Sequence, residues 1–178
     1  MVPLIAFADH LFCAAIAAML AWGAASHLRH WQRFRALVAD YRLVPDFAVR
    51  PTAGAVVLGE WLAAALILVP GPSRVVGFVF GATLLTALAV AMAINLLRGR
   101  RSLSCGCDLF AADRPIAWPL VLRNLLLATL MFAAAGLPRS ALDPGAVVLA
   151  GSIVLAAIVG RAARHRLSIN DRAMEFVR

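Results

Sequence analysis

Long apolar stretches alternate with short polar connections along this chain of 178 residues. Four stretches, residues 4–28, 53–69, 75–97 and 116–137, reach the length of about 17 to 25 residues that a membrane-crossing α-helix needs. A shorter fifth stretch, residues 146–160, precedes a basic tail. The pattern predicts an all-α integral membrane protein whose core is a bundle of four to five transmembrane helices.

The connection between the first two stretches, residues 29–50, has a helical periodicity of its own. Its apolar positions are Trp31, Phe34, Leu37, Val38 and Tyr41, with arginines between them. One apolar and one basic face are typical of an amphipathic helix lying in the membrane interface, and Pro45 is expected to end it. A solvated connector is the alternative interpretation.

The apolar stretches are expected to pack into one domain, because neither an internal repeat nor a second domain is evident. Residues 1–160 would form the transmembrane bundle, with its core at 10–137, and residues 161–178 a basic cytoplasmic tail. Gly77 and Gly81, one helical turn apart, are spaced for close contact between two helices.

Composition supports the membrane assignment. Hydrophobic residues make up 63% of the chain, against about 45–50% in soluble domains, and charged residues only 15%. The net charge of +8 comes from arginine alone, and the arginines punctuate apolar stretches instead of forming one basic face. This distribution argues against nucleic-acid binding. The first ten residues lack the basic region of a signal peptide, so the first stretch should remain as a transmembrane helix.

Arginine placement predicts the orientation, because cytoplasmic loops are enriched in positive charge. Fourteen arginines fall in residues 29–50, 98–114 and 161–178, which alternate crossings place on one side. Arg74 and Arg139 fall on the other side. The N-terminus is therefore expected outside and the C-terminus inside the bacterial plasma membrane.

Polar residues inside apolar stretches are candidate functional groups. Glu60 lies in the second stretch, Asn95 near the end of the third, and Arg123 and Asn124 in the fourth. An unpaired charge at mid-bilayer costs about 2.5–3.5 kcal/mol on insertion scales, so Glu60 and Arg123 are expected to pair. The pair could simply fix helix register, or it could tune a nearby thiol.

Cys105 and Cys107 flank Gly106 in the connection after the third stretch. In an extended chain the distance between their Cα atoms is at the upper limit that a disulfide can span, and Gly106 lets the backbone bend to close the bond. Such a bridge would be strained and readily exchanged. Nearby arginines favour the reactive thiolate. Unreactive thiols are one alternative, and no histidine nearby completes a zinc site, so no metal is expected. Cys13 is interpreted as a packed apolar residue.

These motifs, in this order, resemble the methylamine-utilisation protein MauE family. The matching segments are residues 34–45, Glu60, Asn95 to Gly99, Cys105 to Cys107 and residues 116–124. The resemblance covers about residues 10–137 and implies a fold similar to the DoxX-like and vitamin K epoxide reductase-like bundles. It also implies a role in maturation or export of the disulfide-rich small subunit of periplasmic methylamine dehydrogenase, beside a thioredoxin-like MauD partner.

The leading hypothesis is a membrane thiol–disulfide protein in which Cys105 and Cys107 cycle between dithiol and disulfide. Glu60, Asn95, Arg123 and Asn124 would support them. The alternatives are a non-enzymatic assembly or export factor, a small-molecule carrier, and a quinone-coupled enzyme, the last by fold analogy only. The arginine count places the cysteines inside while the implied client folds outside. Either the loop dips into the bundle, or reducing equivalents cross the membrane, or the cysteines do not serve the client directly.

The orientation can be tested with reporter fusions. A reporter active only in the periplasm should be active when fused after Pro72 or Pro138, because both sites follow an even number of crossings from an N-terminus that is outside. Fusions after Ser102 or at Arg178 should be silent. Activity at Ser102 would overturn the orientation.

Overall fold

The computed structural model of the chain describes residues 2–103, 115–136 and 153, and within them the secondary structure is helical. The helices are α1 (Val2–Arg29), α2 (Trp31–Asp40), α3 (Asp46–Leu68), α4 (Pro72–Leu97) and α5 (Trp118–Gly136). Four of them, all except α2, are long and apolar enough to cross a membrane. The prediction of an all-α membrane protein is confirmed. The predicted fifth stretch and the tail lie outside the described residues.

The structure has two compact units, residues 1–15 with 140–178 and residues 16–139. Helix α1 passes from the first unit into the second at Ile16. In the first unit the Sγ atom of Cys13 lies 4.0 Å from Oδ1 of Asp9, one turn earlier, and Cys13 is a buried free thiol. Its interpretation as a packed residue is confirmed.

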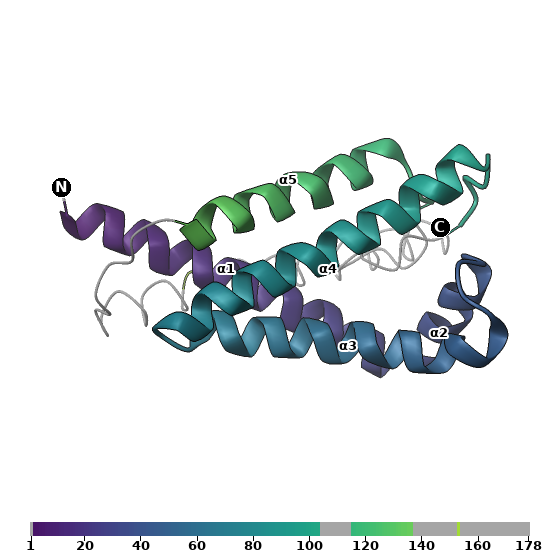
Figure 1. The fold of residues 1–178 in the computed structure, drawn as a ribbon, viewed down its shortest axis with the longest axis horizontal. Helices are drawn as coiled ribbons and strands as arrows, with labels where there is room; N and C mark the ends of the chain where they lie inside the picture. The colour runs from purple at the N-terminus through teal and green to yellow at the C-terminus, as the bar shows by residue number, and fades with distance from the viewer. Residues whose placement is uncertain (1, 104–114, 137–152, 154–178) are drawn as a thin grey trace, which may run out of the picture. The chain divides into compact units, whose positions relative to one another are not determined.

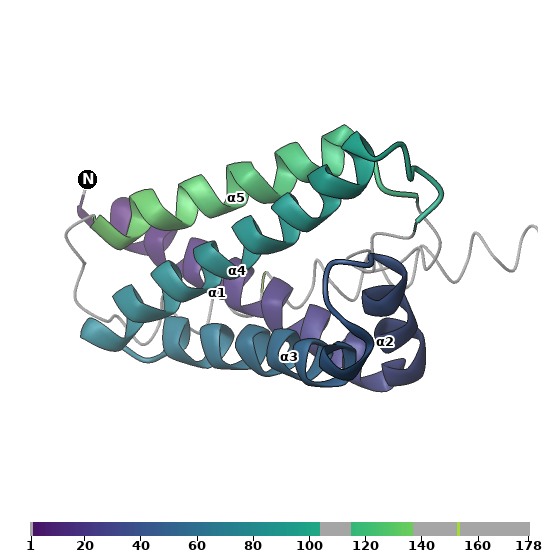
Figure 2. The same cartoon turned by 45° about the vertical axis from the view of Figure 1, so that its right-hand side comes forward.

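Three long helices follow one another side by side in the second unit. Helix α4 packs against both α3 and α5, and the short α2 packs against α3 near the start of that helix (Figures 1 and 2). The turn from α3 to α4 is tight because Gly71 adopts a φ of 92° and Pro72 occupies the first helical turn. Helices α3 and α4 are therefore antiparallel, as a short connection requires.

The amphipathic segment is helical, but it is shorter than predicted. Helix α2 ends at Asp40, and Arg42 has a left-handed backbone with a φ of 49°. Pro45 does not end this helix; it is the N-cap of α3, which begins seven residues before the predicted second stretch. Asp46 in the first turn of α3 faces the positive end of the helix dipole, which favours this earlier start.

The apolar face of α2 is directed inward, as the periodicity predicted. Phe34 is buried, and the side chains of Trp31, Leu37 and Val38 pack around a cluster that includes Ala24 of α1 and residues of α3. The helix is thus held on the bundle by its apolar face, which excludes a structureless connector.

Gly77 and Gly81 mark the places where α4 approaches its neighbours most closely. A Cβ atom on Gly77 would lie 2.7 Å from the backbone nitrogen of Ile67 in α3. A Cβ atom on Gly81 would lie 2.6 Å from the terminal methyl of Met131 in α5. The predicted close contact is confirmed, and it involves two different partner helices.

Replacing Gly77 should destabilise the bundle. Gly77→Ala pushes a methyl group into the backbone of α3, which cannot yield as a flexible side chain can, and overpacking of this kind costs about 1–3 kcal/mol. Gly54→Ala is the matched control, because a Cβ there meets nothing within 4 Å and alanine favours a helix by up to about 1 kcal/mol. Thermal unfolding in detergent should show a lower Tm for the first variant only. Equal Tm values would contradict the close approach.

Candidate functional site

The cysteine-bearing connection is described at its two ends. Cys105 and Cys107 themselves lie outside the described residues. Before them, the carbonyl of Leu103 accepts a hydrogen bond of 2.8 Å from the backbone N–H of Ile116. Both residues pack against the cluster around Met92 of α4. The connection therefore leaves and re-enters the bundle at one place.

The end of α4 is built to turn the chain toward this connection. Gly99 has a φ of 75°, and its N–H bonds to the carbonyl of Leu96 at 3.0 Å. The next N–H, that of Arg100, bonds to the carbonyl of Asn95 at 2.9 Å. These two bonds and the left-handed glycine form a Schellman motif, which satisfies carbonyls that the helix end would leave unpaired.

The side chain of Asn95 fixes the same turn a second time. It is fully buried, and its Oδ1 accepts a hydrogen bond of 3.0 Å from Nη1 of Arg100. Its Nδ2 donates to the carbonyl of Ala91 at 3.2 Å. The same Arg100 nitrogen lies 3.4 Å from the carbonyl of Tyr41 after α2. We name Asn95, Arg100 and Tyr41 the clasp, because they join the start of the cysteine connection to the end of α2.

A second contact brings the same two segments together. Nη1 of Arg98 donates to the carbonyl of Arg42 at 3.5 Å. The first and third connections, both rich in arginine, therefore lie at the same end of the second unit (Figure 2). This agrees with the even number of crossings between them on which the orientation depends.

Glu60 pairs with a residue that the sequence did not single out. Its Oε1 lies 3.7 Å from Nε2 of His27, near the end of α1, and both side chains are buried. No described residue makes a hydrogen bond to Glu60 Oε2. A buried carboxylate with one free oxygen is costly, so the imidazole is its principal compensation within the described chain.

Helix packing holds the two groups in place. A Cβ on Gly23 would lie 3.3 Å from Glu60 Oε1, so glycine lets α1 pass close to the carboxylate. The ring of His27 stacks on that of Phe34 in α2, with centroids 3.9 Å apart and 20° between planes. The His27–Glu60 pair is thus assembled from α1 and α3 and braced by α2.

The expected Glu60–Arg123 pair is wrong. Arg123 is exposed on α5, and its Nη2 lies 3.4 Å from Oδ1 of the neighbouring Asn124, which is buried. Successive residues of a helix point about 100° apart, so only one of the two can face the bundle. In this structure Asn124 faces the bundle and Arg123 faces outward. Its Nδ2 has no hydrogen-bond partner among the described residues.

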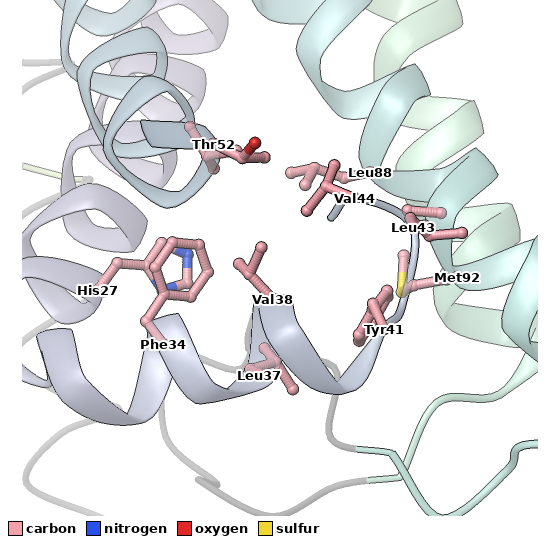
Figure 3. Close-up of a pocket in the computed structure, with 12 residues that line it drawn as sticks. His27, Phe34, Leu37, Val38, Tyr41, Leu43, Val44, Thr52, Leu88 and Met92 are labelled. Atoms are coloured by element: carbon pink, nitrogen blue, oxygen red, sulfur yellow. The ribbon is translucent and has the colours of Figure 1, made fainter. Parts of the chain in front are cut away.

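A pocket of about 120 Å³ lies beside the His27–Glu60 pair. His27 and Phe34 form one side, and Leu88 and Met92 of α4 lie across from them (Figure 3). Tyr41, whose carbonyl belongs to the clasp, also lines it. The pocket therefore lies between the buried pair and the clasp.

The structure offers no metal site in the part of the chain that it describes, since no three side chains of His, Cys, Asp or Glu come together there. The sequence could have identified His27 as a candidate partner of a buried charge. A titratable side chain at the end of an apolar stretch, seven residues before an aromatic on the next helix, is a usable signal. Arg100 carried no such signal, because its role depends on the turn at Gly99.

The fold and the site define a small multi-pass membrane protein. It has four membrane-crossing helices, a buried histidine–carboxylate pair and a polar connection held by the clasp. The family model described as methylamine utilisation protein MauE matches residues 5–138. The chain belongs to the MauE family. No solved structure matches it.

Relatives named methylamine utilization protein MauE match most of this chain. The one from Paracoccus denitrificans is 39% identical over 158 residues, covering 86% of this chain and 83% of its own. The one from Paracoccus versutus is 32% identical and covers 85% and 82%. The one from Methylophilus methylotrophus is 32% identical and covers 94% and 93%.

A double-mutant cycle should detect the pair that the structure contains. Glu60→Gln and His27→Gln should each lower the free energy of unfolding, and the double variant should lose less than the sum. A coupling of about 0.5–3 kcal/mol is expected for residues in contact. Glu60→Gln combined with Arg123→Gln is the control and should be additive within about 0.5 kcal/mol. Additivity in the first cycle would contradict the pair.

Proposed function

We propose that this chain serves methylamine utilisation as a thiol–disulfide protein of the bacterial inner membrane. Cys105 and Cys107 cycle between a disulfide and a dithiol. In the oxidised state the pair accepts two electrons from a client dithiol, so that the client gains a disulfide and the pair becomes reduced. The proposed client is the small subunit of methylamine dehydrogenase. A thioredoxin-like protein of the MauD type, in its disulfide form, takes the two electrons by thiol–disulfide exchange, so that the pair is reoxidised and the partner is reduced.

The clasp is the observation that supports this proposal best. The Schellman motif, the Asn95 side chain and Tyr41 fix the turn after α4, which leads to Leu103 and the cysteine connection. Arg98 and Arg100 are held at that point, where their positive charges favour thiolates on the cysteines that follow. These contacts give the cysteine connection a fixed base at its start.

The proposed orientation puts the cysteine connection on the cytoplasmic side, with the N-terminus outside. The client folds outside, so the proposal includes a transfer of reducing equivalents through the membrane protein or its partner. The contact between the two arginine-rich connections supports their placement on one side.

The rival reading is an assembly or export factor that binds the same partners while its cysteines stay inert. It shares the membrane location and the family, and differs only in the need for thiols. Cysteine replacement therefore separates the two.

Cys105→Ser and Cys107→Ser should each abolish client maturation while leaving the abundance of the membrane protein unchanged. Maturation is measured as assembled dehydrogenase activity, and abundance by immunoblot of the membrane fraction. One of the single variants should also accumulate a mixed disulfide with the thioredoxin-like partner, because the second thiol that resolves it is gone. Cys13→Ser, in a buried site of α1, is the control and should be nearly silent. Full maturation in the double serine variant would favour the assembly factor.

A further inference from the structure

The pocket beside His27 has an almost entirely apolar lining. Val38 and Leu88 are typical of its walls, and neither a carboxylate nor a guanidinium is among the described residues that line it. The His27 ring is taken up by its own contacts, since it stacks on Phe34 and its Nε2 lies 3.7 Å from Oε1 of Glu60. A buried water needs two to four polar partners, which this lining does not supply. The pocket therefore suits a hydrocarbon occupant.

The volume and the opening of the pocket fit a segment of a lipid chain. Its volume of about 120 Å³ is close to that of an apolar protein cavity of about 150 Å³ that holds benzene, so it takes part of a chain and not a whole lipid. Leu43 lines it and is 37% exposed, and Phe47 at the start of α3 is 86% exposed. Both follow the amphipathic α2, which the sequence places in the membrane interface. An acyl chain of the adjoining bilayer can enter there without losing any hydration.

Two arginine side chains from the end of α4 reach the opening of this pocket. Nη1 of Arg98 donates to the carbonyl of Arg42 at 3.5 Å, and Nη1 of Arg100 donates to the carbonyl of Tyr41 at 3.4 Å. Tyr41 and Leu43, on either side of Arg42, line the pocket (Figure 3). Arg42 and Arg98 are exposed. A guanidinium has five N–H donors, so a contact through one nitrogen leaves others for a phosphate.

The positive charge at this opening has no matching negative charge. Among the described residues, none of the three guanidinium groups forms an ion pair with a carboxylate. Residues 29–50 and 98–103 hold eight arginines and only two acidic residues, Asp40 and Asp46. Basic pockets between transmembrane helices are recurrent sites for anionic lipid head groups. The opening therefore favours an anion, and the pocket behind it favours a chain.

From these observations we infer that the pocket and its opening form a binding site for an anionic phospholipid. A segment of one acyl chain occupies the pocket, and the phosphate diester lies at Arg42 and Arg98. A chain gains little by moving from lipid into an equally apolar pocket, so the guanidinium groups supply the preference over neutral lipids. A free phosphate would use the guanidinium groups alone and leave the pocket empty. The site does not involve Cys105 or Cys107 and goes beyond the thiol proposal.

The test uses the full-length protein in phosphatidylcholine nanodiscs that contain a trace of photoreactive phospholipid with a diazirine in one acyl chain. Two probes with the same chains are compared, one a phosphatidylglycerol and the other a phosphatidylcholine. Illumination should label peptides within residues 37–44 and 88–92. The phosphatidylglycerol probe should label them at least about fivefold more, because a basic residue near the membrane surface contributes about 1 kcal/mol to the attraction of anionic lipid. Equal labelling by the two probes would overturn the proposal.

Two variants separate the chain site from the head-group site. Ala91→Phe fills the pocket and should reduce labelling of these peptides severalfold with either probe. Its matched control is Ala87→Phe, one turn earlier on α4 and exposed, which should label as wild type does. Arg98→Gln should lower labelling by the phosphatidylglycerol probe about fivefold and leave labelling by the phosphatidylcholine probe unchanged.

Arg29→Gln removes the same charge at the same end of the unit and is the control for Arg98→Gln. It is exposed, and two residues after His27 the helix has turned by about 200°, so it faces away from the pocket and should label as wild type does. Wild-type labelling in Ala91→Phe would overturn the chain site, and loss of labelling on addition of glycerol 3-phosphate would assign the arginines to a soluble anion. The Cys105→Ser, Cys107→Ser variant should label as wild type does, so a failure of the thiol proposal would leave this one standing.

Discussion

The buried carboxylate of Glu60 is the constraint on which the arrangement of the second unit depends. A buried polar group without a partner is costly, so the fold keeps a partner beside it. That partner is His27 at 3.7 Å, which requires α1 to cross α3 closely, and Gly23 makes the crossing possible. Helix α2 then packs Phe34 on the imidazole. One polar side chain in an apolar helix is thus surrounded by contacts that involve three helices.

The interior of this unit divides into a tightly packed part and a polar part. Gly77 packs against the backbone of α3 with no room for a methyl group, and Gly81 packs against the end of the Met131 side chain of α5. Toward the other end of α4 the helices separate enough to leave the pocket, and there Asn95, Arg100 and Tyr41 form the clasp. Rigid packing at one end gives the polar end a fixed base, which a precisely positioned connection needs.

The pocket between the buried pair and the clasp connects these two features physically. Tyr41 contributes to both, since its side chain lines the pocket and its carbonyl lies within reach of Arg100. A ligand in the pocket would therefore contact the residue that anchors the base of the cysteine connection. Membership of the MauE family gives this arrangement a biological setting in methylamine utilisation.

The sequence by itself determined the membrane class, the four crossing helices, the inward face of α2 and the close contacts of Gly77 and Gly81. These follow from periodicity and residue size, which are local properties. Only the tertiary structure decided which polar groups meet. Glu60 lies beside His27 and not beside Arg123, because the rotation of α5 directs Asn124, and not Arg123, toward the bundle. The partner of a buried polar group depends on how the helices are rotated and where they cross. Neighbouring residues of a helix point about 100° apart, and neither the composition of a stretch nor a residue's depth in the membrane shows which of them faces the bundle.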